Sequence, residues 1–249
     1  MIRLKNAREI DGIRRSGRLL ARTLAALAAE TREGMTTRDL DDFARSFIVA
    51  RGGRPSFLGY LDFPASVCIS VNAEVIHGIP GARRLRDGDL VGLDLGVDLE
   101  GYFSDAAVTV AVGRVPNGRQ RLLEVTRECL DRALAAARPA ARISDISRAV
   151  FDHASANGFG VVREYCGHGV GFSPHEDPQV PNYVGGGPNP RLKEGMVLAV
   201  EPMINAGSGD IELAEDGWTV LTADGADSAH FEHTIAITRA GMEILTRLE

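Results

Sequence analysis

Two segments of ten residues have the same character at each position although they lie more than 100 residues apart. LRDGDLVGLD starts at Leu85, and LKEGMVLAVE starts at Leu192. Each segment ends in an acid six residues after its glycine, Asp94 in the first and Glu201 in the second. Solenoid repeats have periods of roughly 20 to 50 residues, so a period this long excludes them. The chain is therefore predicted to contain a duplicated unit with pseudo-two-fold symmetry.

The predicted secondary structure follows the same order in both halves of the chain. Apolar residues at helical spacing predict two helices before Gly52, and strand-like runs such as DLVGLDLGV follow them. Two further helices are predicted in NGRQRLLEVTRECLDRALAAA and SDISRAVFDHASANG, the second with Ser144 as its cap. More strands end in HFEHTIAITRAG. This order predicts two helix-helix-strand halves, at about 1–113 and 114–249.

Size and composition favour one compact domain in a reducing compartment. The 249 residues are 44% hydrophobic, which is enough for a sizeable core. A net charge of -6 leaves no basic field to hold nucleic acid or an anionic membrane. Three cysteines in a chain of this size do not suggest a disulfide framework, and neither a membrane span nor a signal peptide is evident. We therefore expect a single cytoplasmic domain without nucleic-acid or membrane partners.

Acids inside apolar strands are the strongest chemical signal. Each half supplies a second acid on a later strand, Asp105 in FSDAAVTV and Glu232 in HFEHTIAI, so that four acids are expected at two pairs of equivalent places. A buried acid is costly unless a cation or a proton neutralises it. An arginine could neutralise any one of them, but four acids at symmetric positions favour divalent ions. The sequence predicts a dinuclear site, with metals about 3.5 to 4 Å apart as in two-metal hydrolases.

His168 is the predicted nitrogen ligand of this site. It lies in YCGHGVGFSPHEDPQV, where the flanking glycines are expected to let the backbone approach a metal without interference from side chains. Four carboxylates and one imidazole suit Co, Mn, Fe or Zn, and the sequence does not choose among these ions.

The other histidines have different expected roles. His77 in VIHGIPG and His175 are expected to hydrogen-bond a substrate carbonyl or a developing oxyanion, with a structural role as the alternative. His230 shares a strand face with Glu232 and could border the site, whereas His233 points to the opposite face and is expected to pack.

The order of the five expected ligands, with HGIP, CGHGVG, HEDPQV, EPM and FEHT around them, resembles the type I methionine aminopeptidases over nearly the whole chain. The resemblance implies the α+β pita-bread (creatinase/aminopeptidase) fold. In that fold, two pseudosymmetric halves with curved antiparallel strands surround a dinuclear metal site, and the helices lie outside. The implied activity is removal of the initiator methionine from newly made proteins and peptides.

The resemblance also implies a role for each ligand. Asp94 would chelate one metal, and His168 and Glu201 would chelate the other. Asp105 and Glu232 would bridge both. A water or hydroxide between the metals would attack the first peptide bond, with Glu201 transferring the proton.

The substrate-binding residues implied by the resemblance surround this centre. His175 would hydrogen-bond the scissile carbonyl, and His77 would contact the nitrogen side of the same bond. Phe57 stands where many relatives carry a cysteine, which puts the width of the pocket in question. The methionine pocket would be formed partly by Tyr60, Phe63 and Cys68, together with Phe172, His230 and either Trp218 or Phe231.

The implied partners are peptides and nascent proteins that begin with methionine, with weak contact to the ribosome, and the chain is expected to be a monomer. Two alternatives remain. An Xaa-Pro aminopeptidase would keep the five ligands but add an N-terminal domain, for which the chain has no room. A non-enzymatic pita-bread binding module would have lost ligands, whereas all five are present.

Overall fold

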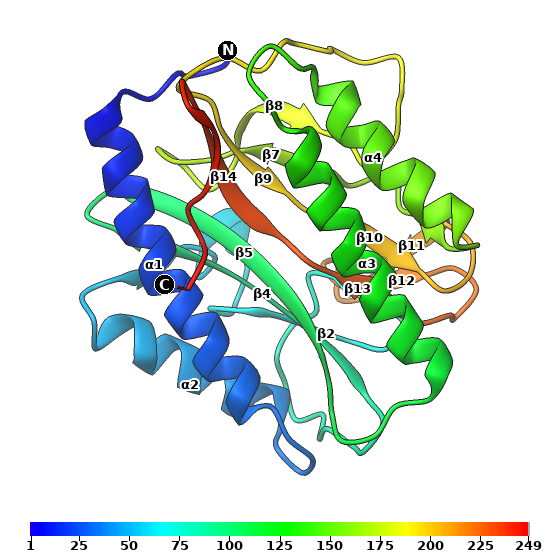
Figure 1. Cartoon of the computed structure of the whole chain (residues 1–249). Coiled ribbons are helices and arrows are strands. Elements are labelled where there is room, and N and C mark those ends of the chain that lie inside the picture. Colours follow the sequence, from blue (N-terminus) through cyan, green and yellow to red (C-terminus); the bar gives the residue numbers. More distant parts are fainter. Residues whose placement is uncertain (249) are drawn as a thin grey trace.

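The computed structural model describes residues 1–248 and has helices on the outside of a central set of curved strands (Figure 1). Its four α-helices within that range are α1 (Ala7–Glu30), α2 (Thr37–Val49), α3 (Asn117–Ala136) and α4 (Ile143–Ala156). Figure 1 shows α1 and α2 on one side of the strands and α3 and α4 on the other. Among these helices, none combines the length and the apolar character that a membrane crossing requires.

Two antiparallel sheets form the centre, one from each half of the chain. In the first, β4 pairs with its three neighbours; the strands are β1 (Arg54–Pro55), β2 (Cys68–Val71), β4 (Leu90–Leu99) and β5 (Tyr102–Ala111). The second has the order β15-β14-β9-β7-β8; its strands are β7 (Gly167–Gly169), β8 (Glu176–Val180), β9 (Val197–Val200), β14 (His233–Thr238) and β15 (Gly241–Ile244). In both sheets the middle strand carries the repeated segment.

Two three-stranded sheets complete the architecture. One has the order β13-β10-β6, from β6 (Gly160–Val161), β10 (Met203–Asn205) and β13 (Ser228–His230). The other has the order β11-β12-β3, from β3 (Glu74–Ile76), β11 (Ile211–Leu213) and β12 (Val220–Thr222). A short 3-10 turn, η1 (Tyr60–Asp62), lies between β1 and β2.

Local capping explains where the helices begin. Asn6 caps α1: its side chain accepts hydrogen bonds from two backbone amides, and Glu9 accepts one from the Asn6 amide in return. The start of α4 differs from the prediction, because the helix begins one residue before Ser144. The Asp145 carboxylate accepts the backbone amide of Arg142, and the Asn189 side chain accepts the amide of Ser144. Part of the cap is therefore supplied by Asn189, a residue distant in sequence, which no local pattern reveals.

Each half has its own apolar core. In the first half, Leu20 and Leu40 of the two helices pack with Leu93 of β4. In the second, Leu122 and Ile146 occupy the same kind of cluster with strands β9 and β14. Complete burial of one such side chain stabilises the fold by about 1.5–3 kcal/mol. Each sheet is thereby held against its own pair of helices.

Equivalent backbone hydrogen bonds confirm the predicted pseudosymmetry. Before β4, the Leu85 amide donates to Met35, and the Gly34 amide donates to the Leu85 carbonyl. Before β9, Leu192 makes the same pair of bonds, donating to Ala141 and accepting from Ala140. In both halves, the residue that starts the repeated segment is therefore bonded in the same way to the loop between the two helices.

Candidate metal centre and substrate cavity

Strand pairing places two of the predicted ligands on one face of the first sheet. Asp94 in β4 lies opposite Ala107 in β5, and Asp105 in β5 lies opposite Gly96. Directly opposed residues share a face of the sheet, and so do residues two apart on one strand. The carboxylates of Asp94 and Asp105 therefore project from the same face.

The second sheet presents the other three in the same manner. His168 in β7 and Thr234 in β14 both lie opposite Ala199 in β9. Glu201 directly follows β9, and Glu232 directly precedes β14, at the same end of this strand pair. The pairing places both acids on the face that carries His168.

Side-chain hydrogen bonds join β5 of the first half to β14 and β13 of the second. The Asp105 amide donates to the Thr234 hydroxyl at 2.9 Å, and this hydroxyl donates to the Asp105 carbonyl at 2.7 Å. Thr109 makes the same two bonds with the backbone of His230, at 2.9 and 2.8 Å. The five predicted ligands are thus brought together at the boundary between the halves.

These bonds correct one prediction about the repeat. Leu93 and Val200 occupy the same place in the repeated segments, and they pair with Val108 and His233. Thr109 and Thr234, which follow these partners, are therefore equivalent, and the position equivalent to Asp105 is that of His230. Glu232 is equivalent to Ala107, to whose carbonyl its own amide donates at 2.9 Å. The expected equivalence of Asp105 and Glu232 is therefore wrong by two residues, whereas Asp94 and Glu201 are equivalent.

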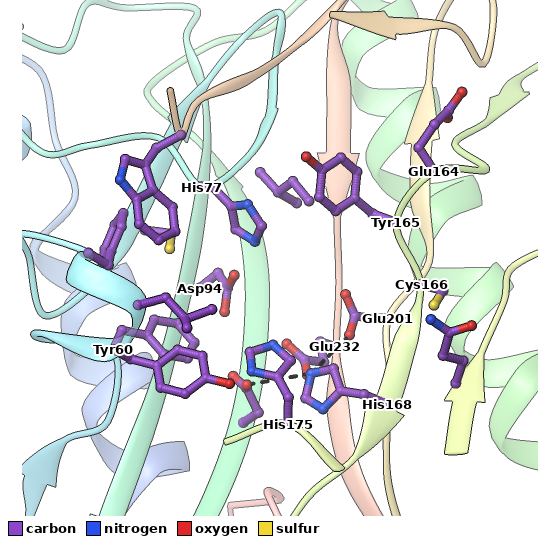
Figure 2. Close-up of a pocket in the computed structure, with 18 residues that line it drawn as sticks. Tyr60, His77, Asp94, Glu164, Tyr165, Cys166, His168, His175, Glu201 and Glu232 are labelled. Carbon is purple, nitrogen blue, oxygen red and sulfur yellow. Dashed lines mark ion pairs between the residues drawn. The ribbon is translucent and has the colours of Figure 1, made fainter. Parts of the chain in front are cut away.

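The acids and the imidazole converge on one place (Figure 2). His168 Nε2 lies 3.4 Å from Glu201 Oε1 and 3.9 Å from Asp105 Oδ2. One ligand atom from each of Asp105, His168 and Glu232 lies within 4.8 Å of the others. Figure 2 shows Asp94 directed toward the same place from the opposite side.

Burial makes this cluster unfavourable as a set of free charges. It raises the pKa of Asp94 to about 7 and lowers the pKa of His168 to about 3. Burial, reinforced by the neighbouring carboxylates, raises the pKa values of Asp105, Glu201 and Glu232 well above the usual range. Among residues 1–248, no arginine or lysine forms an ion pair with any of the four acids.

Unpaired oxygen atoms show that the cluster fits a divalent cation. Asp94 Oδ1, Asp105 Oδ1 and Glu232 Oε1 are buried and have no hydrogen-bond partner. Buried polar atoms without a partner are rare because each costs free energy. Four carboxylates and a neutral imidazole are suitable ligands for a divalent metal, which would satisfy these oxygens.

The glycines beside His168 serve a different purpose from the one predicted. A Cβ atom on Gly167 would lie 2.4 Å from the carbonyl oxygen of Ala199, and one on Gly169 would lie 2.2 Å from that of Asp177. Both contacts are with backbone of neighbouring strands. The glycines therefore allow β8 and β9 to approach β7 closely, and this packing holds His168 in place.

A cavity of about 450 Å³ lies above the cluster. Phe57 and Leu61 are among its apolar lining residues, and Phe57 belongs to an apolar cluster with Phe63, Cys68 and Trp218. Glu164, Tyr165 and Gln179 also line the cavity, and Figure 2 shows Glu164 and Tyr165 on the side opposite Tyr60. Of the predicted substrate-binding residues, six line the cavity: Tyr60, Phe63, Cys68, His77, His175 and Trp218. Glu164, Tyr165 and Gln179 were not predicted, although Tyr165 precedes His168 by three residues, at the start of the same segment.

Ring contacts organise the wall and the two histidines. Tyr60 stacks on His175 with centroids 5.3 Å apart, and Phe63 meets Trp218 edge to face at 5.1 Å. His77 contacts Tyr165 at 5.5 Å. Burial lowers the pKa of His77 to about 4 and also lowers that of His175. Both imidazoles are therefore neutral near pH 7, and each can donate one hydrogen bond.

Phe172 does not line the cavity that the structure describes. Its ring lies 6.4 Å from that of Tyr102, and the guanidinium of Arg3 lies 4.2 Å above it. Phe231 is also elsewhere, buried in the core beside α3. The N-terminal segment occupies the space next to Phe172, so the geometry gives this side chain no contact with the cavity.

The remaining histidines lie outside the cavity. His230 is buried, with Nε2 3.8 Å from Glu201 Oε2, so it borders the acids from behind. His233 pairs with the Thr246 hydroxyl at 2.9 Å, in agreement with the predicted packing role.

Comparison with known proteins shows the family to which the chain belongs. Residues 11–239 match the metallopeptidase family M24. The chain is 50% identical to methionine aminopeptidase 1 of Bacillus subtilis (strain 168) over 250 residues, which cover 100% of both proteins. A crystal structure of methionine aminopeptidase from Rickettsia prowazekii matches with a TM-score of 0.96 and 40% identity, covering 99% of this chain and 100% of that one.

The fold extends to a related class of peptidases. The prolidase from Pyrococcus horikoshii OT3 matches with a TM-score of 0.81 and 25% identity, covering 99% of this chain and 64% of that one. These likenesses confirm the predicted α+β pita-bread fold. The chain therefore belongs to the metallopeptidase family M24 and, within that family, to the methionine aminopeptidases.

Proposed function

We propose that this enzyme removes the initiator methionine from peptides and nascent proteins by hydrolysing the first peptide bond. The observation that carries the proposal is the position of the buried acid cluster, at the floor of a cavity of about 450 Å³ with an aromatic wall. The chain length also agrees with relatives named methionine aminopeptidase, which align over 100% of both chains.

We assign the metal ligands to both halves of the fold, so that residues 1–249 act as one catalytic domain. Asp94, Asp105, His168, Glu201 and Glu232 would hold two divalent ions, Co, Mn, Fe or Zn. The unpaired buried oxygens of three of these acids support the assignment. When bound, divalent ions supply Lewis-acid polarisation of the scissile carbonyl and lower the pKa of a nucleophilic water.

The protein's own residues move the proton and orient the peptide. Glu201 would accept and return a proton, a role supported by its position in the lining of the cavity, with Oε1 3.4 Å from His168 Nε2. The neutral His175 imidazole would donate a hydrogen bond to the scissile carbonyl oxygen as negative charge develops on it. His77 would contact the nitrogen side of the same bond. Stacking on Tyr60 fixes the plane of the His175 ring.

The aromatic wall is suited to a methionine side chain. Tyr60, Phe63 and Trp218, together with Cys68, offer aromatic rings and sulfur at one end of the cavity. A thioether packs favourably against aromatic ring edges, by about 0.3–1.5 kcal/mol per contact. Phe57 is 8% exposed and lines the same wall, so we propose that it limits the width of the methionine pocket.

We propose that the enzyme acts in the cytoplasm, because its proposed substrates are the N-termini of nascent chains. We further propose that the enzyme acts as a monomer and touches the ribosome only weakly. The net charge of -6 supports weak contact, because ribosomal RNA repels an acidic surface.

One assay tests the proposed function against its nearest alternative. Purified protein loaded with Mn, Co or Fe should release methionine from Met-Ala-Ser and leave Ala-Pro-Ala intact. Preference for Ala-Pro-Ala would instead assign the chain to the Xaa-Pro aminopeptidases. Asp105→Ala should abolish release, and full turnover by this variant or by metal-stripped protein would refute the mechanism. Failure of every metal form to cleave either peptide would support a binding module.

A further inference from the structure

The segment before α1 runs alongside the second half of the fold (Figure 1). Lys5 in this segment is buried. The Lys5 amide donates to the carbonyl of Gly195 at 2.7 Å. The Lys5 ammonium donates to Glu176 Oε2 at 2.6 Å, and these two side chains are 1% and 5% exposed. Lys193, the other lysine of the chain, is exposed and makes no such pair within residues 1–248. Lys5 is thus the one lysine held inside the described structure.

Glu176 joins this N-terminal segment to the loop before β8. While Oε2 binds Lys5, Oε1 accepts the backbone amides of Phe172 and Ser173 at 2.7 and 3.2 Å. The Ser173 hydroxyl in turn donates to the carbonyl of His175 at 2.9 Å. A single carboxylate therefore fixes the start of the loop, and the loop fixes the backbone of the residue just before Glu176.

The N-terminal segment also touches the loop directly. A Cβ atom on Gly171 would lie 3.0 Å from Lys5 Cε and 2.6 Å from Ile13 Cδ1 of α1. Gly171 has a φ of 138°, a conformation that other residues rarely adopt. Its carbonyl accepts the amide of Phe103 at the start of β5. The loop is held on one side by the first half of the fold and on the other by Glu176.

The loop that Glu176 holds carries His175, whose ring lies beside the acid cluster. The His175 imidazole lies in the cavity, with its centroid 4.1 Å from that of His168 and 5.3 Å from that of Tyr60 (Figure 2). A displacement of the loop backbone would move this ring relative to a substrate carbonyl. A buried ion pair is weak as a source of stability, because desolvation offsets the attraction, but its directed hydrogen bonds restrict geometry.

We propose that Lys5 is a positioning residue for catalysis, which acts through Glu176 to hold His175 against the substrate. The inference rests on the substrate-binding role of His175 under the proposed function. It gives a residue at the N-terminal edge of the first half control over a side chain supplied by the second half. Hydrogen bonding of the scissile carbonyl would then depend on the N-terminal segment as well as on the cavity itself.

The decisive variant removes the ion pair between Lys5 and Glu176 but leaves no unpaired buried charge. In Lys5→Met/Glu176→Gln, the glutamine oxygen still accepts the two loop amides, whereas the bond to the N-terminal segment is lost. We expect kcat for Met-Ala-Ser to fall by about 10- to 100-fold, as small displacements of catalytic groups do, while KM and metal content stay close to wild type. The single variant Lys5→Arg, which keeps a cationic donor, should retain most of the wild-type kcat. Lys193→Met is the matched control and should have wild-type kcat.

Two further measurements separate positioning from a structural role. Hydrogen exchange should be faster at the amides of 172–176 in the double variant than in wild type or Lys193→Met. In a His175→Ala background, removal of Lys5 should have no further effect on kcat, because the group that it positions is absent. A lower melting temperature with unchanged kcat would overturn the inference, and so would an undiminished loss of kcat in the His175→Ala background.

These outcomes are distinct from failure of the proposed function. If wild-type protein cleaves Met-Ala-Ser and the double variant cleaves it equally well, the function stands and the role of Lys5 is refuted. If wild-type protein cleaves neither peptide in any metal form, the proposed function fails, and the inference falls with it.

Discussion

The hydroxyl of Thr234 and the backbone of Asp105 form two hydrogen bonds, one in each direction, across the boundary between the halves. Thr234→Val has nearly the same shape but removes both bonds and leaves a buried amide and carbonyl unpaired. Loss of such bonds costs about 1–3 kcal/mol of unfolding free energy. Because Asp105 is a proposed ligand, we also expect weaker metal affinity, measured by competition with a chelator.

Thr109 provides a control within the same molecule. It makes the equivalent bonds with His230, which is not a proposed ligand. Thr109→Val should therefore lower the unfolding free energy to a similar extent, measured with urea, while metal affinity changes less than in Thr234→Val. Equal loss of affinity in the two variants would mean that Thr234 does not act through Asp105.

Replacement of the two histidines of YCGHGVGFSPHEDPQV should have different effects on metal content. His168→Ala removes a proposed ligand, so metal content after dialysis should fall together with activity. His175→Ala removes a proposed hydrogen bond to the substrate, so activity should fall while metal content remains close to wild type. Metal analysis of both variants after identical loading checks the distinction. An equal loss of metal from the two would contradict it.

The stability of metal-free protein should decrease as the pH rises. The pKa of Asp94 is raised by burial to about 7, and burial together with the neighbouring carboxylates also raises those of Asp105, Glu201 and Glu232 well above their usual range. In the unfolded chain such groups titrate near pH 4, so between about pH 4 and 7 the folded state binds more protons. The unfolding free energy contributed by these acids is therefore present below about pH 4 and is lost as the pH rises.

Calorimetry of chelator-treated and metal-loaded protein at several pH values tests this dependence. The stabilisation by metal should grow over the same window, because an ion competes with protons for the carboxylates. A melting temperature of the metal-free protein that rises between pH 5 and 7 would contradict the assigned burial of uncompensated acids.

Close strand packing at His168 should make its neighbour intolerant of a methyl group. Gly167→Ala places a Cβ atom against the Ala199 carbonyl, which cannot move without disturbing β9. Overpacking of this kind costs about 1–3 kcal/mol. Gly186→Ala, where nothing lies within 4 Å of the new atom, is the control and should be close to neutral. Urea unfolding of both variants measures the difference, and equal midpoints would exclude steric conflict at Gly167.

The acids of the site can be predicted from the sequence because each lies in an unusual local context. An acid such as Asp94 within an apolar strand is unusual wherever the strand lies, and the repeat pairs it with Glu201 without any knowledge of the fold. The relation between Asp105 and Glu232 was misjudged because equivalence depends on strand register, which the character of the residues does not determine. The position of Phe172 depends on Arg3 and the N-terminal segment, a contact between residues far apart in the chain.

Some equivalent positions on the two sides of the pseudo-two-fold axis carry different residues, and this difference has an evolutionary consequence. In a symmetric dimer of identical subunits, one mutation appears on both sides of the axis. Two similar halves within one chain are free of this restriction, and here Asp105 is equivalent to His230 while Ala107 is equivalent to Glu232. A substitution in one half therefore changes the charge on one side of the centre without changing the other side. An asymmetric reaction centre can thus descend from a symmetric ancestor by substitutions that occur on one side alone.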